Sequence, residues 1–346
     1  MSDFLRRLGI EHPIILAPMA GGAGTPELVA AVSNAGGLGS WGGAYSTPQQ
    51  ILDGARQIRA LTGKPFALNL FAGGYEPERN VDPGAMLALV SRVHAELGLP
   101  PPVLPPNPQS PLGDQLAAVI EARPAVFSFT FGIPAGDALA RMRKAGILTS
   151  GTATTVEEAK ALAEAGVDNV VCQGEEAGAH RGTFLKPFEQ SMVPARELVA
   201  RTLKAVSVPV IASGGLMDGK DIAAMLRLGA AAAQLGTAFL PCPECGTPAV
   251  HKQAILNARA DTTVITRAYS GRPARGLRNK FIDLARGPDI LPFRQQNDLT
   301  RPMRGEAGKN GVADYLSLWV GRGVTRARQM PAADLVKTLV DEIARA

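Results

Sequence analysis

Val208-Pro209-Val210-Ile211-Ala212-Ser213-Gly214-Gly215 and Ala232-Ala233-Gln234-Leu235-Gly236-Thr237 are the stretches that decide the fold. Each is a short apolar run bounded by turn residues, as expected for a buried strand. Each also ends in small residues, which are typical of the tight turn between a strand and the helix after it. The pair therefore predicts two consecutive parallel strands, which we number seven and eight because six similar runs precede them.

The six earlier runs alternate with Ala-rich helical stretches. They lie at residues 13–19, 36–41, 66–70, 125–130, 147–150 and 169–173. Helix starts are marked by Thr25-Pro26 and Thr47-Pro48, in which threonine caps the helix and proline fits its first turn. Eight strands with intervening helices predict an α/β chain folded as a (β/α)8 TIM barrel. The alternative, an open doubly wound sheet, usually carries Gly-x-Gly-x-x-Gly after its first strand, and residues 20–24 lack that spacing.

Two segments interrupt the alternation. Residues 71–112 are rich in proline and only residues 82–97 look helical there, which predicts an elaborated loop at the carboxyl end of strand three. Residues 241–305 show no strand–helix rhythm and are predicted to form a smaller, inserted, substrate-side domain. Helical periodicity is expected again from Val312 through Val320 and over 332–346. The predicted units are a cofactor-binding barrel at 1–240, the insertion at 241–305, and C-terminal helices at 306–346 that return to the barrel.

Composition narrows the class of protein. Of the 346 residues, 46% are hydrophobic and 19% charged, which is ordinary for a globular chain. The net charge of +5 is spread along the chain, so a small anionic ligand is expected rather than nucleic acid, which requires clustered basic residues. Neither a signal peptide nor a membrane-spanning apolar run is recognised, so a cytoplasmic location is expected. Cys242 and Cys245 have the spacing of half a zinc site, but without a second ligand pair we expect a turn and no metal.

The turns after strands seven and eight carry the strongest chemical signal. Gly214, Gly215 and Gly236 let the backbone approach a ligand closely, and a phosphate bound there also meets a helix N-terminus. In (β/α)8 barrels these two loops are the usual phosphate site. The other interpretation is that the glycines only make tight turns. Two such turns in these two places favour a phosphate site.

His180 is the candidate catalytic residue. It follows strand six in a loop that also contains three glycines, and the loops at the carboxyl ends of the strands form the active-site face of this fold. Imidazole is the usual general acid or base near neutral pH. His12, His94 and His251 are expected to be incidental, because they lie before strand one, in the elaborated loop and in the insertion.

Polar side chains near the strand ends complete the candidate site. Asn69 at the end of strand three and Gln173 at the end of strand six offer amides to a heteroaromatic ring, although Asn69 could equally cap a turn. Beside the histidine, Glu175, Glu176 and Arg181 either orient the imidazole or form local salt bridges. We expect local salt bridges.

Four motifs in the chain carry a family resemblance. They are Ala17-Pro18-Met19-Ala20-Gly21-Gly22, Ala35-Gly36-Gly37-Leu38-Gly39, Gln173-Gly174-Glu175-Glu176-Ala177-Gly178-Ala179-His180-Arg181-Gly182 and Tyr315-Leu316-Ser317-Leu318-Trp319-Val320-Gly321. Together they resemble nitronate monooxygenases, formerly called 2-nitropropane dioxygenases. The resemblance extends over nearly the whole chain.

The resemblance implies an FMN held without covalent attachment in the barrel. His180 would lie over the flavin and act as a base when a neutral nitroalkane must lose its α-proton, whereas a nitronate anion needs no base. Tyr315, Lys309 and Tyr269 resemble residues that contact the anion. The implied flavin contacts, with Gly214 added from the phosphate turn, are Met19, Asn69, Gln173, Gly178, Gly214, Gly215, Gln234, Leu235, Gly236 and Thr237.

The implied activity is oxidation of alkyl nitronates by dioxygen, through a flavin semiquinone, to a carbonyl compound and nitrite. Two positions depart from the family pattern. Ala179 stands where a second glycine is more common, and Thr130 stands where some relatives carry histidine, which leaves the handling of protons or oxygen open. The oligomeric state is also open.

Two other functions compete with this interpretation. The fold and the histidine loop also resemble FMN-dependent enoyl-acyl-carrier-protein reductases and NADH:quinone reductases, which reduce their flavin with NAD(P)H, although no diagnostic nicotinamide site is recognised. The Tyr315-to-Gly321 motif favours the nitronate oxidisers. A barrel that only binds a phosphorylated ligand is disfavoured, because binding alone needs no imidazole in a glycine-rich loop.

Overall fold

The computed structural model describes residues 2–74, 81–107 and 109–346. The eight predicted strands form one parallel sheet in the order β1-β9-β8-β6-β5-β4-β3-β2. Bridges from Ile15 to Leu38 and from Met19 to Trp41 join its two ends, so the sheet closes and the (β/α)8 barrel is confirmed. The strands are β1 (Ile14–Leu16), β2 (Gly39–Gly42), β3 (Phe66–Phe71), β4 (Val126–Thr130), β5 (Leu148–Ala153), β6 (Asn169–Gln173), β8 (Val210–Ser213) and β9 (Ala232–Leu235).

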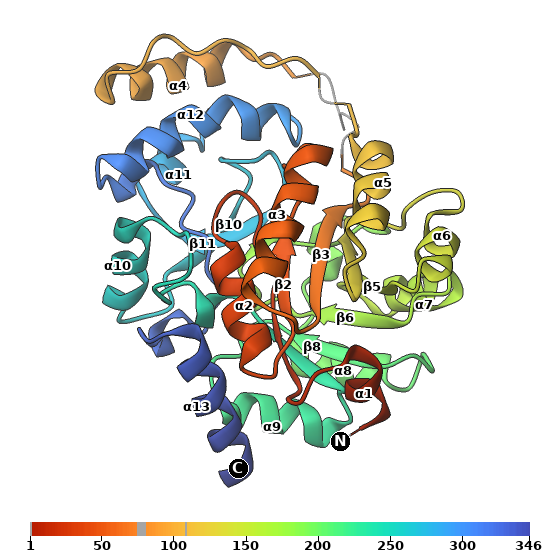
Figure 1. Ribbon diagram of the computed structural model, residues 1–346. Helices are drawn as coiled ribbons and strands as arrows, with labels where there is room; N and C mark the ends of the chain where they lie inside the picture. The colour runs from red at the N-terminus through yellow and green to blue at the C-terminus, as the bar shows by residue number, and fades with distance from the viewer. Residues whose placement is uncertain (1, 75–80, 108) are drawn as a thin grey trace.

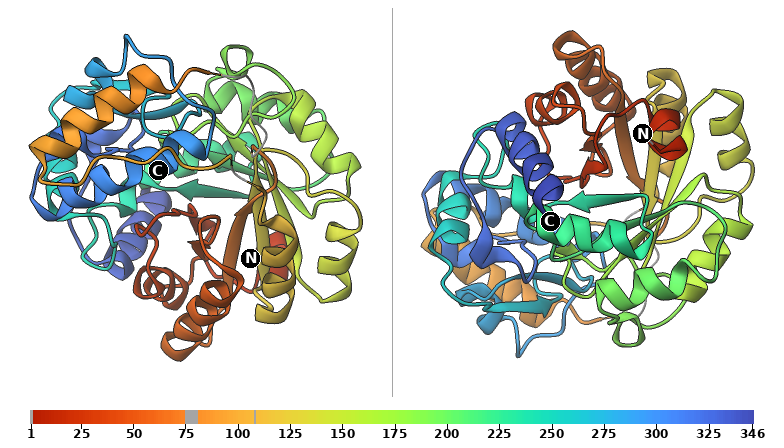
Figure 2. Two further views of the ribbon diagram at one scale, coloured as in Figure 1. Left: turned by 90° about the horizontal axis from the view of Figure 1, so that it is seen from above. Right: turned by 90° about the horizontal axis from the view of Figure 1, so that it is seen from below.

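Helices surround this sheet, as the views from above and from below show (Figure 2). The predicted starts of the first two are correct, because Thr25 and Thr47 each accept a hydrogen bond from a first-turn amide and a proline follows each. The helices that follow barrel strands are α2 (Pro26–Asn34), α3 (Pro48–Leu61), α5 (Leu112–Ala122), α6 (Ala138–Lys144), α7 (Val156–Glu164), α8 (Ala195–Thr202) and α9 (Gly219–Leu228). The last helix, α13 (Ala332–Arg345), packs against α9 and α2.

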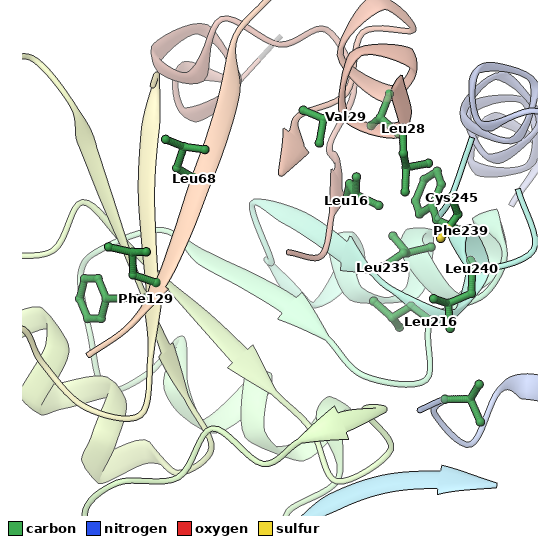
Figure 3. Packing of buried hydrophobic residues seen from close by; sticks show 14 of the residues in the cluster. Leu16, Leu28, Val29, Leu68, Phe129, Leu216, Leu235, Phe239, Leu240 and Cys245 are labelled. Atoms are coloured by element: carbon green, nitrogen blue, oxygen red, sulfur yellow. The ribbon is translucent and has the colours of Figure 1, made fainter. Parts of the chain in front are cut away.

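Two layers of apolar side chains hold the barrel together. Outward-facing strand residues such as Leu16 and Leu235 pack with Leu28 and Val29 of α2 and with Phe239, all of them buried (Figure 3). Inside the barrel a second cluster joins strand residues, Ile15 among them, to the short helix α1 (Asp3–Leu8). Apolar contacts therefore fill the amino-terminal end of the barrel, and the carboxyl-terminal end is left for polar groups.

A small antiparallel sheet lies beside the barrel. Its order is β10-β11-β7, built from β10 (Thr263–Thr266), β11 (Ala274–Leu277) and β7 (Ala179–His180). The predicted insertion at 241–305 contributes β10 and β11, together with α10 (Ala249–Asn257), α11 (Lys280–Leu284) and the start of α12 (Gln295–Lys309). The candidate catalytic histidine is thus an edge-strand residue of a sheet that the insertion supplies. The division into three units stays a prediction.

The elaborated loop after β3 carries α4 (Gly84–Glu96), close to the predicted helix at 82–97. This helix packs against α12, and in Figure 1 the two lie side by side at the top of the molecule. Residues 75–80 and 108 of the predicted loop lie outside the described residues. In the described part of the chain, no helix has both the length and the apolar character needed to cross a membrane.

The helix expected from Val312 through Val320 is wrong. This stretch contains only a short 3-10 turn, η3 (Ala313–Tyr315), and then runs extended, with a bridge between Trp319 and Gly276 of β11. Leu316, Leu318 and Val320 are buried whereas Ser317 and Trp319 are only partly so. That alternation has the period of two that belongs to a strand-like segment. The remaining short turns are η1 (Phe188–Ser191), η2 (Thr237–Phe239) and η4 (Val324–Arg326).

Candidate active site

A cavity of about 390 Å³ opens at the carboxyl ends of the barrel strands. The strand ends, the turns after β8 and β9, the β7 loop and parts of α10 and α12 all line it. In a (β/α)8 barrel this end is where ligands bind, because eight adjustable loops converge there. Among the described residues that line the cavity none is aspartate or glutamate, whereas Arg301 and Arg304 are both present. The cavity therefore suits an anionic ligand.

The structure brings all the predicted cofactor contacts together. Each of them lines this one cavity, although they come from five different strands or loops. The residues are Met19, Asn69, Gln173, Gly178, Gly214, Gly215, Gln234, Leu235, Gly236 and Thr237. Their role as cofactor ligands stays a prediction, which the geometry below supports.

The turn after β8 has the geometry of an anion cradle. Gly214 and Gly215 have φ angles of 115° and 72°, a region that side chains disfavour. A Cβ atom on Gly215 would lie 2.9 Å from Cβ of Glu176. Within the described residues, the amides of Gly215, Gly236 and Thr237 donate to no backbone or side-chain acceptor of the protein. Unsatisfied amides on two neighbouring turns are the donors that a phosphate needs.

The two predicted amide side chains differ in how firmly they are held. Asn69 donates through Nδ2 to Oγ of Ser128 at 2.9 Å. Gln173 accepts through Oε1 from Nη1 of Arg181 at 3.1 Å and from the amide of Gly182 at 2.8 Å, and its Nε2 donates to the carbonyl of His180 at 3.0 Å. Because both donors act on Oε1, the amide orientation of Gln173 is fixed and its Nε2 serves as a donor.

Arg181 and the two neighbouring glutamates have separate structural roles. Arg181 is completely buried and also donates to the carbonyls of Gln173, Gly174 and Ser191. Glu175 forms a salt bridge at 2.8 Å with Arg322, which lies 147 residues further along the chain, so this ion pair is not the local one that was expected. Glu176 accepts instead from the amide of Ala195, the first residue of α8. The loop that carries His180 is thus fixed on both sides.

His180 lies in the cavity among aromatic rings. The ring centroids of Phe131, Phe293 and Trp319 are 5.9, 5.7 and 5.9 Å from that of the imidazole, and Phe71 follows at 6.4 Å. These side chains come from β3, the residue after β4, the segment before α12 and the C-terminal extended segment. The imidazole therefore works in apolar surroundings that exclude water from most of its surface.

Ser270 sets the protonation pattern of the imidazole. Nε2 of His180 lies 2.8 Å from Oγ of Ser270, and that hydroxyl is also within hydrogen-bond distance of the carbonyl of Arg272, at 3.1 Å. When the hydroxyl donates to this carbonyl, Nε2 donates to Ser270 and Nδ1 carries the lone pair. The neutral imidazole is thus arranged as a hydrogen-bond acceptor, or base, at Nδ1.

Burial and two positive charges keep this imidazole neutral. Desolvation, followed by the charges of Arg272 and Arg304, lowers the pKa of His180 from its ordinary value of 6.5 to about 3. Arg272 stacks on the ring of Phe131 at 3.9 Å. Arg304 donates to the carbonyl and side chain of Asn297, both at 2.9 Å. An anion bound between these groups would offset their charge and make the imidazole easier to protonate.

The three predicted substrate contacts lie outside the cavity lining. Tyr269 is fully buried and its hydroxyl donates to Oδ1 of Asn279 at 2.9 Å. Lys309 is exposed at the end of α12 and pairs with Glu306. Tyr315 hydrogen-bonds Lys280 and Glu96. The structure does not bring these side chains to His180, and their role as substrate contacts stays a prediction.

Other residues stand where substrate contacts were expected. Tyr45, Asn297, Arg301 and Arg304 line the cavity, and three of them come from α12. They were missed because α12 belongs to a segment without strand–helix rhythm. A usable signal exists, since positions 297, 301, 304 and 305 follow the helical spacing of one face. His251, expected to be incidental, also lines the cavity.

The cysteine pair forms a buried turn after η2. Cys242 and Cys245 are both buried, and Sγ of Cys245 donates to the carbonyl of Ala23 at 3.1 Å. Burial raises the pKa of the Cys242 thiol to about 12, so it stays protonated. No cluster of three or more metal-binding side chains occurs among residues 2–74, 81–107 and 109–346.

Comparisons with known proteins identify the family of this chain. The family model described as nitronate monooxygenase matches residues 3–342. Nitronate monooxygenase from Pseudomonas aeruginosa is 42% identical over 353 aligned residues, covering 99% of both chains. A crystal structure of nitroalkane oxidase from Streptomyces ansochromogenes superposes with a TM-score of 0.89 at 38% identity, covering 99% of this chain and 98% of that one. FabK from Thermotoga maritima is more distant, with a TM-score of 0.72 and 28% identity over 100% of this chain and 96% of that one. This chain is an oxidoreductase that belongs to the nitronate monooxygenase family.

Proposed function

We propose that this enzyme oxidises alkyl nitronates with dioxygen to a carbonyl compound and nitrite, and that FMN is its cofactor. Neutral nitroalkanes are also substrates once His180 has removed their α-proton. The observation that carries the proposal is the neutral imidazole of His180, bonded at Nε2 to Ser270, in a cavity whose described lining includes arginines and no carboxylate.

The residues in the cavity fit FMN from end to end. The amides of Gly215, Gly236 and Thr237 suit its phosphate, and a side chain at Gly215 would crowd Glu176. Asn69 and the fixed amide of Gln173 suit the polar edge of its ring system. When bound, FMN would supply the redox centre that accepts an electron from the anion and delivers it to dioxygen. No metal is required for this chemistry.

The protein's own contribution to the reaction centres on His180. Nδ1 takes the α-proton of a neutral nitroalkane, and Ser270 holds the ring through Nε2 while the imidazole becomes positively charged. The nitronate that forms is an anion, which Arg304 and the imidazolium stabilise in surroundings of low polarity. A substrate that arrives as a nitronate needs no proton removal, so for it these residues serve only to bind the anion.

Substitution of His180 by asparagine separates proton removal from anion binding. General-base catalysis contributes roughly 10²- to 10⁴-fold, so kcat/KM for neutral nitroalkanes should fall by that amount in the His180→Asn variant, with a much smaller loss on preformed nitronates. Oxygen consumption with both forms of one substrate measures the difference. Bound flavin absorbance serves as the control for cofactor retention, and His12→Asn is the matched histidine variant outside the cavity. Equal losses on both forms would contradict the base role.

NAD(P)H-dependent reduction of quinones or enoyl thioesters is the competing function. The 28% identity to FabK is a reason to test it. Anaerobic mixing of the flavin-loaded enzyme with NADH and with NADPH gives a direct answer. We expect the flavin absorbance to persist, and rapid bleaching would favour the reductase.

A further inference from the structure

Arg301 is an exposed cation in the lining of the cavity. It is one of two arginines in the described lining, and the other, Arg304, is half-buried. A residue that is both exposed and part of the lining lies at the entrance, where the cavity meets the solvent. The two arginines are three positions apart on α12, a spacing that places them on one face of the helix. An anion that enters along this face therefore meets Arg301 before it meets Arg304.

The acidic residues of α12 already have cationic partners, and neither of them pairs with Arg301. Asp298 forms an ion pair with Arg294 at 3.5 Å, and Glu306 forms one with Lys309 at 3.2 Å. In the part of the chain that the structure describes, the guanidinium of Arg301 has no hydrogen bond and no ion pair. Its charge and its donors are therefore available to a ligand.

Arg304 has a different role, because the protein itself holds its side chain. Its guanidinium donates to the carbonyl and to Oδ1 of Asn297, both at 2.9 Å, and Nη1 lies 3.5 Å from Oγ of Ser317. These contacts fix the charge of Arg304 in one place beside the imidazole of His180. Arg301 lacks such contacts, so its side chain is free to follow an incoming anion.

The face of α12 that carries Arg301 borders the histidine end of the cavity. Phe293 lies two residues before α12, and its ring centroid is 5.7 Å from that of His180. Burial, and then the charges of Arg272 and Arg304, lower the pKa of His180. Arg301 lies between Phe293 and Arg304 in the sequence, so an anion bound to it is close to the residue that handles the α-proton.

On the basis of the proposed function, we infer that Arg301 is a specificity-determining residue that captures the nitronate anion at the entrance and so favours it over the neutral nitroalkane. The planar fork of a guanidinium matches the two oxygens of a nitronate, as it matches those of a carboxylate. The described lining contains no carboxylate that would oppose the attraction. A neutral nitroalkane has no net charge, so it gains little from this residue.

Two variants of Arg301 and one control test this role. Arg301→Gln removes the charge, whereas Arg301→Lys keeps the charge and loses the planar fork. Arg196→Gln is the matched control, because Arg196 is an exposed arginine of α8 outside the cavity lining. Oxygen consumption is measured with the nitronate and with the neutral form of one nitroalkane, at low and at high salt. Bound flavin absorbance reports cofactor retention.

The expected loss is specific for the anion. A local charge raises the concentration and association rate of an oppositely charged substrate by roughly 10- to 10³-fold. At low salt, Arg301→Gln should therefore lower kcat/KM for the nitronate by about 10-fold or more, mainly through a higher KM, and leave kcat/KM for the neutral form unchanged. Arg301→Lys should recover most of the loss, and Arg196→Gln should behave as the unsubstituted enzyme does.

Salt provides a second measurement that needs only the nitronate. Charge screening reduces the range of the attraction to about 3 Å at 1 M salt. In the unsubstituted enzyme, kcat/KM for the nitronate should fall as salt rises and approach the value for Arg301→Gln, which should change little with salt. If neutral nitroalkanes are not turned over, this comparison decides, because a structural defect would persist at high salt.

Three results would overturn the inference. They are an unchanged kcat/KM for the nitronate in Arg301→Gln, a loss that is equal for both substrate forms or persists at high salt, and a loss of bound flavin, which would indicate that Arg301 binds the phosphate of the cofactor. Failure of the proposed function would look different, because the unsubstituted protein would then consume no oxygen with either substrate form.

Discussion

Ala179, the residue before His180, has a φ of 59°. This left-handed conformation costs an alanine roughly 1–2 kcal/mol, and glycine adopts it without that cost. Glycine loses roughly 0.5–1 kcal/mol more in chain entropy on folding, which offsets part of the gain. Alanine in place of the family's usual glycine thus puts backbone strain next to His180. The alanine also restricts the loop to fewer conformations than glycine would allow.

Ala179→Gly should therefore stabilise the protein by up to about 1 kcal/mol. Urea unfolding of the flavin-loaded enzyme measures this. Arg123→Gly is the matched control, because Arg123 has a φ of 45° at the end of α5, away from the cavity lining. We expect the control to gain stability with unchanged activity, while Ala179→Gly loses some kcat because His180 is held less firmly. A loss of stability in Ala179→Gly would show that the alanine side chain makes a compensating contact.

Ser270→Ala tests the tautomer of His180. Without the hydroxyl, Nε2 of His180 has no partner. The ring hydrogen can then lie on either nitrogen, and Nδ1 no longer always carries the lone pair. Loss of one hydrogen bond of ~1.4 kcal/mol predicts about a 10-fold fall in kcat on neutral nitroalkanes, with little change on nitronates. The readout is oxygen consumption with both forms across a range of pH. Ser33→Ala, equally buried in α2 but outside the cavity lining, controls for the loss of a buried hydroxyl. The same loss on both substrate forms would mean that Ser270 acts only as a structural residue.

At the scale of elements, α4 is held against the rest of the molecule through its last residue. Glu96 ends this helix, and its carboxylate accepts from Tyr315 and from Lys280 at 3.1 Å. The hydroxyl of Tyr315 also accepts from Lys280, at 2.6 Å. Because α4 packs against α12, whose other residues line the cavity, this cluster supports one wall of the site from outside.

Tyr315→Phe should leave KM unchanged, because the hydroxyl contacts Glu96 and Lys280 and does not line the cavity. Hydrogen exchange in α4 should become faster, since one of its attachments is lost. Tyr269→Phe is the matched variant, because it removes another buried hydroxyl from a tyrosine predicted to contact substrate. A rise in KM in Tyr315→Phe would instead support the direct substrate contact that the family resemblance implies.

Strands and helices could be predicted from the sequence where the spacing of apolar residues fitted only one of the two. All eight strands and the capped starts of α2 and α3 follow from short apolar runs and Thr-Pro pairs. The stretch 312–320 was mistaken because its alternating apolar residues are few and lie between polar turns. β10 and β11 were not expected, since their pairing depends on contacts made far along the chain.

At the scale of the whole molecule, the imidazoles of His180 and His251 link stability to pH. His180 and His251 have pKa values lowered to about 3 and about 4, from an ordinary value of 6.5. Both are therefore neutral in the folded protein, while the unfolded chain takes up protons below pH 6.5. The unfolded state then binds more protons, and the free energy of unfolding falls as the pH drops from 6.5 toward 4.

Urea unfolding at several pH values between 7.5 and 4.5 should show this loss. For His251 alone the slope approaches about 1.4 kcal/mol per pH unit below 6.5. His251→Asn should show a correspondingly weaker decline. Parallel curves for His251→Asn and the unsubstituted protein would contradict the low pKa.

The site was predictable in part, for reasons that follow from distance along the chain. The sequence was enough to place three residues at the site, because the fold fixes where the strand ends converge. These residues are Gly215, Gln234 and His180. Ser270, Arg304 and His251 act on the same cavity from the segment after β9, and only the tertiary structure shows which of its residues point inward. Sequence patterns indicate local periodicity, but they do not indicate which residues far apart in the chain meet in the cavity.

The pairing of β7 with β11 also sets the order in which this protein can mature. Ala179 and His180 form ladder pairs with Arg275 and Ala274, and β1 pairs with β9. A chain emerging from the ribosome therefore has His180 long before it has the strand that pairs with it. All eight barrel strands are made before β11, whereas α13, which packs against α9 and α2, is made after it. The covering of the barrel and the pairing of the histidine loop therefore both wait for the C-terminal part of the chain.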